Sequence, residues 1–133
     1  MHNKEIEKIK IIFLDKLSTP DSKWPFDVKR IVNLIHSCLF KEYLTIAYIR
    51  EKCSINDNGF AGQFKYFVGK TPKDYILFLR ITCAKKILEC NLDKISMTDI
   101  SYSLGFTTLA GFSLCFKSRT HLPPSAWVKT KFK

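Results

Sequence analysis

Two segments of this sequence repeat one pattern of aromatic, basic and proline residues. Each reads Phe-x3-Phe-Lys, followed seven residues later by Pro-x2-aromatic, and the segments span residues 60–75 and 112–127. Phenylalanines at this spacing share one face of a helix, which is typical of a packed core. The lysine after each pair falls off that face, and a solvent-facing ammonium suits contact with phosphate. The chemistry that this pattern favours is binding to a polyanion.

No arrangement of nucleophiles or metal ligands accompanies these segments in the sequence. Ser113 and Ser125 have no elbow glycines and no partnered histidine. The three histidines and five cysteines form no CxxC pair and show no spacing typical of metal ligands. We therefore expect no catalytic residues, no metal site and no cofactor, and we interpret the cysteines as free thiols in a reducing cytoplasm.

The charge of the chain supports the same interpretation. Its 22 Lys and Arg residues against 12 Asp and Glu residues give a net charge of +10. Residues 27–133 hold 17 basic and 8 acidic side chains, so the charge lies in the body of the protein rather than in a terminal tail. The uninterrupted apolar runs are far too short to cross a bilayer, and the N-terminus does not resemble a signal peptide. These features favour a cytoplasmic protein that binds nucleic acid and does not bind a membrane.

The spacing of apolar residues predicts an all-α fold. At 133 residues the chain is too short for a barrel enzyme, and only residues 9–13 fit a short strand as well as a helix. Apolar residues three and four apart predict about seven helices in two helix-turn-helix subdomains bridged by a long helix, plus an N-terminal helical extension. The predicted boundaries are an extension over 1–24 and a domain over 25–133, with a first helix-turn-helix over 44–69, a linker helix over 72–90 and a second helix-turn-helix over 97–120.

Short polar residues are expected to cap several helices. Thr45 and Thr71 are predicted N-caps, and either Ser96 or Thr98 caps the following helix. A helix is also predicted over residues 27–42, and a turn over 91–95.

The linker helix over residues 72–90 is apolar on two sides, which predicts packing between two bodies. Its polar residues are expected to face solvent or a ligand; they are Arg80, Lys85, Lys86 and Glu89.

The sequence leaves the role of the segment from Asn3 to Leu17 open. Its apolar residues recur at helical spacing, which suits a dimerisation helix, the remnant of a linker, or a helix packed on the first subdomain. Met1 directly before this segment favours a short stand-alone chain over one cut from a longer protein.

The sequence resembles the AraC/XylS-type bacterial transcription regulators from about Val28 to Val128. The most specific part of the resemblance is Ile100-Ser101-x2-Leu104-Gly105-Phe106-x5-Phe112-Ser113-x2-Phe116-Lys117, then Pro124-Ser125-x-Trp127. The first half matches at Leu44-Thr45, Phe64-Lys65, Gly69, Pro72-x2-Tyr75 and Leu79-Arg80-x3-Ala84-Lys85-Lys86. The resemblance implies about seven helices, two of which recognise promoter DNA, in a protein that recruits or obstructs RNA polymerase.

The residues expected to face the bases are unusually small or apolar. Gly62 and Leu114 stand where the family commonly has a long polar residue or arginine, so neither recognition helix offers an arginine for bidentate contact with guanine. Asn58 and Gln63 suit adenine, and the apolar side chains suit thymine methyl groups. The full expected set is Asn58, Ala61, Gly62, Gln63, Thr108, Leu109, Gly111, Ser113 and Leu114.

Contacts with phosphate are expected to be better supplied. These residues lie at helix ends or on basic faces, where they position a protein on DNA without selecting a sequence. The expected set is Thr45, Lys65, Tyr66, Lys70, Arg80, Lys117, Ser118 and Arg119. We therefore expect a monomer that binds double-stranded DNA with strong salt dependence and modest specificity, favouring A/T-rich sites.

A protein-interaction module on the same fold, with weak or no DNA readout, is the alternative. Small and apolar residues at Gly62, Leu109, Gly111 and Leu114 suit a protein contact. RNA polymerase is a further candidate partner, and dimerisation through the N-terminal segment stays open.

Overall fold

The computed structural model describes residues 3–90 and 95–132, and this part of the chain contains α-helices and no strand. Its helices are α1 (Lys4–Asp15), α2 (Phe26–Cys38), α3 (Ile46–Lys52), α4 (Phe60–Val68), α5 (Pro72–Glu89), α6 (Met97–Ser103), α7 (Leu109–Thr120) and α8 (Pro124–Lys131). The all-α prediction is confirmed, and residues 9–13 lie within α1. The turn predicted over 91–95 falls, except for Ile95, outside the described residues.

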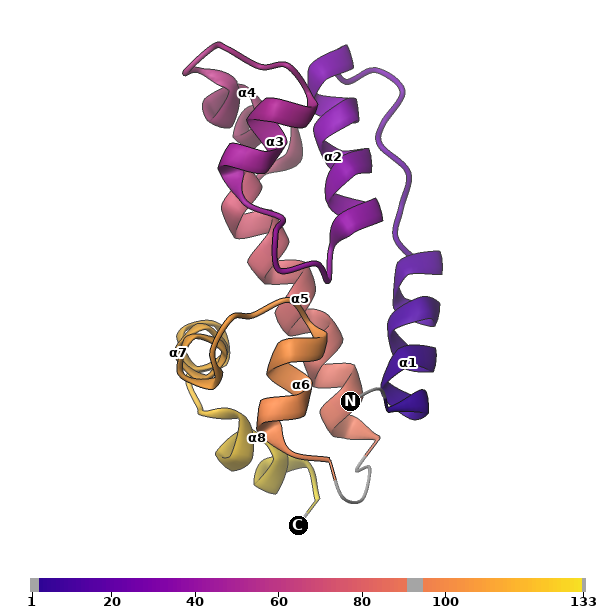
Figure 1. Ribbon diagram of the computed structural model, residues 1–133, viewed down its shortest axis with the longest axis vertical. Helices are drawn as coiled ribbons and strands as arrows, with labels where there is room; N and C mark the ends of the chain where they lie inside the picture. The colour runs from indigo at the N-terminus through magenta and orange to yellow at the C-terminus, as the bar shows by residue number, and fades with distance from the viewer. Residues whose placement is uncertain (1–2, 91–94, 133) are drawn as a thin grey trace.

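The long helix α5 connects two groups of helices (Figure 1). One group holds α2, α3 and α4, and the other holds α6, α7 and α8. Helix α5 contacts α4 of the first group and both α7 and α8 of the second, and apolar residues on two of its sides are buried. The predicted packing of this helix between two bodies is confirmed. Within the described ranges, no helix combines the length and the apolar character needed to cross a bilayer.

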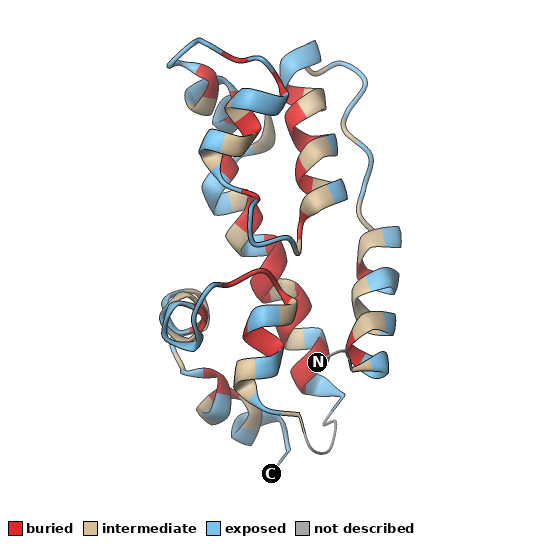
Figure 2. Ribbon diagram, in the orientation of Figure 1, coloured by how far each residue is buried: buried red, intermediate tan, exposed pale blue. Residues whose placement is uncertain are grey.

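Buried positions occur on the helices of both groups (Figure 2), and each group contains an aromatic pair in its core. Phe64 of α4 is fully buried, and its ring centroid lies 5.9 Å from that of Tyr75. In the second group Phe116 of α7 is fully buried, and its ring lies edge-on to Trp127 at 5.6 Å. The repeated sequence pattern therefore corresponds to the same packing contact in both groups of helices. The aromatic residue after the proline packs on the second phenylalanine of the preceding helix.

Polar caps and one glycine fix where several helices begin and end. Thr45 and Thr71 each accept a hydrogen bond from the backbone N–H three residues further on, at 3.1 Å and 3.2 Å. Of the two candidates for α6, Ser96 rather than Thr98 is the N-cap, with a bond of 3.0 Å. Helix α4 ends at Gly69, whose φ of +94° is the left-handed conformation that glycine adopts without strain.

Helix α2 ends at Cys38, four residues before the predicted end at Glu42. The chain turns there, and the N–H of Lys41 donates to the carbonyl of Cys38 at 2.9 Å. The carbonyl of Leu39 accepts instead from the side chain of Arg80 in α5, at 2.8 Å. A tertiary hydrogen bond thus replaces the next helical one, which apolar spacing alone does not reveal.

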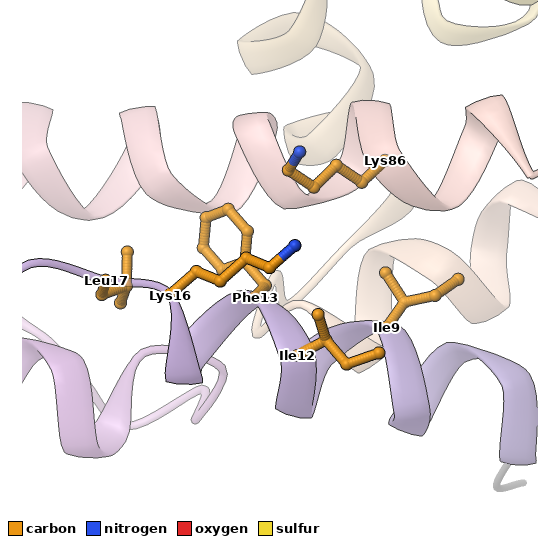
Figure 3. A pocket seen from close by; sticks show the side chains of 6 residues that line it. All are labelled: Ile9, Ile12, Phe13, Lys16, Leu17 and Lys86. Atoms are coloured by element: carbon orange, nitrogen blue, oxygen red, sulfur yellow. The ribbon is translucent and has the colours of Figure 1, made fainter.

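Helix α1 packs against α5 (Figure 1). Ile6 and Phe13 are buried, and the ring of Phe13 lies 6.3 Å from that of Phe40. Figure 3 shows a largely apolar pocket between the two helices, bordered by α1 side chains and by Lys86 of α5. Of the roles that the sequence leaves open for this segment, the structure shows packing within the chain, on the linker helix α5, and dimerisation through α1 stays a prediction.

Candidate nucleic-acid interface

Helix α4, the first predicted recognition helix, carries an open surface at its predicted base-facing positions. Gly62 and Gln63 are exposed, as is Asn58 in the turn before the helix, while Ala61 is half-buried. A Cβ atom added to Gly62 would meet no other atom within 4 Å. The backbone of α4 is therefore accessible to a large partner along this face.

Arg50 of α3 is a basic residue beside this surface that the sequence analysis did not single out. Its Nη2 donates to Oδ1 of Asn58 at 3.3 Å and to the backbone carbonyl of Asn56 at 3.4 Å. The guanidinium also lies 5.3 Å from the ring of Phe60, at the first turn of α4. A recognition helix without an arginine of its own thus has a guanidinium beside its N-terminus. The signal in the sequence was a basic residue in the last turn of the supporting helix.

Helix α7, the second predicted recognition helix, is preceded by a threonine whose hydroxyl group caps the helix. Oγ1 of Thr108 accepts from the backbone N–H of Gly111 at 2.9 Å, so Thr108 is the N-cap of α7. Leu114 is 71% exposed and Leu109 is 37% exposed, whereas Ser113 is half-buried. The solvent-facing surface of this helix is therefore more apolar than polar at the predicted base-facing positions.

Four of the predicted phosphate contacts line one open pocket, which we call the basic pocket. Lys65 and Lys70 come from α4 and the turn after it, while Ser118 and Arg119 come from the end of α7. Helix α5 supplies the other side chains between them. The full lining is Lys65, Gly69, Lys70, Asp74, Phe78, Ile81, Thr82, Lys85, Ser118 and Arg119. The basic pocket thus joins both helix-turn-helix units and holds four cationic groups against one carboxylate.

Contacts inside the basic pocket hold some of these cations in place. Nη2 of Arg119 lies 3.6 Å from Oδ1 of Asp74, which links the end of α7 to the start of α5. Nζ of Lys70 lies 4.6 Å from the centroid of the Phe78 ring. Lys85 is the cationic residue of the basic pocket that was not among the predicted phosphate contacts. Its helical spacing from Asp74 and Phe78 is the signal that would have included it.

The remaining predicted phosphate residues lie outside the basic pocket. Tyr66 is 81% exposed on α4, and Lys117 is exposed on α7. Thr45 is exposed at the start of α3, where its hydroxyl oxygen caps the helix. These three side chains are accessible from solvent but come from separate elements.

Arg80 does not face solvent, so the prediction that it contacts phosphate is wrong. Its side chain is buried, with 6% of the residue exposed, and its guanidinium donates to backbone carbonyls in two loops. Burial lowers the pKa of Arg80 to about 10, which still leaves it a cation at neutral pH. Helical spacing placed Arg80 among polar residues because it cannot distinguish a solvated arginine from one whose donors are satisfied by carbonyls.

A helix-turn-helix domain is the class of protein that this fold and its repeated helix pairs define. A family profile described as a helix-turn-helix domain matches residues 51–130. The chain belongs to the AraC-type helix-turn-helix family.

Known proteins with similar sequences or folds agree with this assignment. The chain is 35% identical over 98 residues to the uncharacterized HTH-type transcriptional regulator YobQ of Bacillus subtilis (strain 168), covering 74% of this chain and 39% of YobQ. The C-terminal domain of AraT, a response regulator from Geobacillus stearothermophilus, has a TM-score of 0.73 at 19% identity, covering 82% of this chain and 88% of that domain. The DNA-binding domain of AdpA, a global transcriptional factor solved in complex with a target DNA, has a TM-score of 0.67 at 15% identity, covering 78% and 91%. The chain spans less than half the length of the curated relatives it matches.

Proposed function

We propose that this chain is a transcription regulator domain that binds double-stranded DNA and performs no catalysis. It places α4 and α7 in adjacent major-groove segments, and contacts with phosphates dominate its affinity. The basic pocket is the observation that carries the proposal, because it brings cationic side chains from both helix-turn-helix units to one surface beside α5. Phosphates of the DNA backbone between the two recognition helices would contact these cationic side chains.

The length of α5 supports docking by a single chain. Its 18 residues, at about 1.5 Å each, span roughly 27 Å. Successive major-groove faces on one side of B-DNA lie about 34 Å apart. The two spans are comparable, so a monomer reaches two adjacent segments without a partner subunit.

The surfaces of the recognition helices support modest sequence specificity. Asn58 and Gln63 offer amide groups for adenine, and Leu109 and Leu114 offer methyl groups for thymine. Gly62 leaves room for close approach of the backbone and reads no base itself. We therefore infer a preference for A/T-rich sites, with most of the affinity independent of sequence.

The relatives support a regulatory role in bacteria. YobQ is named as a transcriptional regulator, and the AdpA domain was solved with a target DNA. We infer that this chain acts in the bacterial cytoplasm and that RNA polymerase is the protein partner of its DNA complex.

Fluorescence anisotropy across a salt series tests this proposal, using duplexes of about 24 base pairs with random and promoter sequences. Lys65→Ala and Lys117→Ala each remove one phosphate contact, so each weakens binding to both duplexes and reduces the salt slope by about 1. Lys8→Ala is the matched control, because it removes the same charge from α1, where the Lys8 side chain is 71% exposed.

Any of three results would overturn the docking scheme. The first is an affinity that does not change between low and physiological salt. The second is unchanged binding in both Lys65→Ala and Lys117→Ala, and the third is an equal loss of affinity in Lys8→Ala.

A protein-interaction module is the second candidate, and the exposed side chains of the recognition helices favour it. Tyr66 is 81% exposed and Leu114 is 71% exposed, and side chains of these types anchor protein interfaces. If the wild-type chain fails to bind either duplex even at low salt, this candidate replaces the DNA-binding proposal.

A further inference from the structure

Arg80 joins the two helix-turn-helix units through its guanidinium. Nε donates to the carbonyl of Leu39 at 2.8 Å, and Nη2 donates to the carbonyl of Lys41 at 2.9 Å. Both acceptors lie in the turn after α2, within the first group of helices. Nη1 donates to the carbonyl of Gly105 at 3.4 Å, in the turn between α6 and α7 of the second group. We call this meeting point of α5 and the two turns the joint (Figure 1).

The two turns of the joint approach each other closely at Gly105. A Cβ atom added there would lie 2.8 Å from Nη2 of Arg80 and 3.1 Å from the backbone carbonyl carbon of Phe40. The φ of Gly105 is +94°, a conformation that other residues rarely adopt. Glycine is therefore required both for the turn and for the contact across the joint.

An aromatic ring and backbone carbonyls around Arg80 hold its guanidinium in one orientation. The ring of Phe106, next to Gly105, lies 5.6 Å from the guanidinium carbon, and the carbonyls of Leu39 and Lys41 lie at the C-terminal end of α2. A guanidinium complements the partial negative charge at the end of a helix. No salt bridge to Arg80 exists among the residues that the structure describes, so its buried donors depend on these carbonyls.

A stabilising role alone does not account for this arrangement. An apolar side chain at position 80 would fill the space between the two turns without burying a charge. The planar guanidinium of Arg80 has acceptors in both units, so its donors are all paired only when the two units hold one relative orientation. The recognition helices α4 and α7 lie one in each unit, so that orientation also sets the distance and angle between them.

We propose that Arg80 is a positioning residue, which fixes the orientation of the two helix-turn-helix units and thereby the spacing of their recognition helices. This inference rests on the proposed function only where it concerns affinity for DNA; the positioning of the two units does not depend on it. Rigid coupling of two binding units raises the effective concentration of the second once the first is bound, whereas loose coupling lowers it.

Residual dipolar couplings measured on the full chain without DNA test the positioning role directly. In the wild-type protein one alignment tensor fits the amide couplings of both units. In Arg80→Met, which removes the donors and keeps an unbranched side chain, we expect the two units to require different tensors. Lys86→Met is the matched control, because it removes one exposed charge from the same helix without touching the joint.

The second readout compares affinity for random duplexes of about 24 and about 12 base pairs, which offer two major-groove segments or one. We expect Arg80→Met to weaken binding to the longer duplex about tenfold while leaving the shorter duplex nearly unchanged. Lys86→Met should lower both affinities by the same factor. A role in stability alone would not change the ratio of the two affinities at temperatures well below the melting point.

Arg80→Lys keeps the charge and loses the planar fork of donors, so it serves as the second variant if Arg80→Met does not fold. One shared tensor together with an unchanged affinity ratio in a folded Arg80 variant would overturn the proposal. Unfolding of both variants, seen by circular dichroism, would also overturn it, because Arg80 would then be required for the fold itself. If the wild-type chain binds neither duplex, the proposed function fails while the dipolar couplings still decide the role of Arg80.

Discussion

Leu114 and Gly62 leave the two recognition helices without a long polar side chain at central positions. Leu114 is 71% exposed, and Gly62 faces open space. Cationic groups lie beside this surface, where Arg50 contacts the turn before α4 and Lys65 of α4 lines the basic pocket. Under the proposed function, affinity for DNA and specificity for a sequence therefore come from different side chains, and side chains of the second kind are scarce.

Restoring an arginine at the exposed position on α7 tests whether this surface meets the bases. We expect Leu114→Arg to tighten binding by about 1 kcal/mol or more on duplexes that offer guanine, because a bidentate contact becomes available. Ile11→Arg is the control, since Ile11 is 58% exposed on α1, which packs on α5 across from α7 (Figure 1). Anisotropy titrations that give equal gains for both variants would mean that only the added charge matters.

The two arginines that the sequence analysis misjudged show the limit of reading single residues. Arg80 was predicted at the surface, and Arg50 was not singled out at all. The guanidinium of Arg80 donates to a carbonyl in a loop far away in the chain, whereas that of Arg50 donates to the carbonyl of Asn56 in the loop just after its own helix. The acceptors of Arg80 come together only in the tertiary fold, so helical spacing does not identify them in advance; the position of Arg50 in the last turn of α3 was a signal that could have been used.

At the scale of elements, a polar contact links α2, in the first group of helices, to the bridging helix α5. Nε2 of His36 and the hydroxyl of Tyr75 lie 2.6 Å apart. Burial lowers the pKa of His36 from its ordinary value of 6.5, and burial raises the pKa of Tyr75. The neutral forms of both side chains are therefore the ones that the folded protein favours.

This contact predicts how stability depends on pH. Since the folded-state pKa of His36 is lowered, the unfolded chain binds the proton more readily, so the free energy of unfolding falls as the pH drops below about 6.5. We expect His36→Gln, which stays neutral, to flatten that part of the profile measured by urea unfolding. His121→Asn, at an exposed position after α7, serves as the control, and an equally flat profile in that variant would contradict the assignment to His36.

Elements were more predictable than their contacts. The repeated aromatic pattern predicted two equivalent helix pairs, and Phe64 with Tyr75 and Phe116 with Trp127 form equivalent contacts. The predicted end of α2 was wrong because the carbonyl of Leu39, the residue after α2, accepts a hydrogen bond from Arg80 of α5 instead of continuing the helix. Local pattern thus determines where helices form, while contacts between distant segments decide where some of them stop.

At the scale of the whole molecule, part of the net charge of +10 lies where the two units approach each other. The basic pocket draws cations from α4, α5 and α7, and the joint holds the units together on the same central helix. The sequence analysis singled out three of the four cationic members of the pocket, Lys65, Lys70 and Arg119, as phosphate contacts, yet it did not predict that they lie together. That proximity depends on the angle between the units, which no local pattern encodes.

Hydroxyl-radical footprinting on a site enriched from a random DNA pool tests the central claim most directly. We expect one chain to protect two windows on one face of the duplex, centred about 10 base pairs apart, because α4 and α7 would occupy successive major-groove segments. A single protected window of one major-groove segment would contradict it.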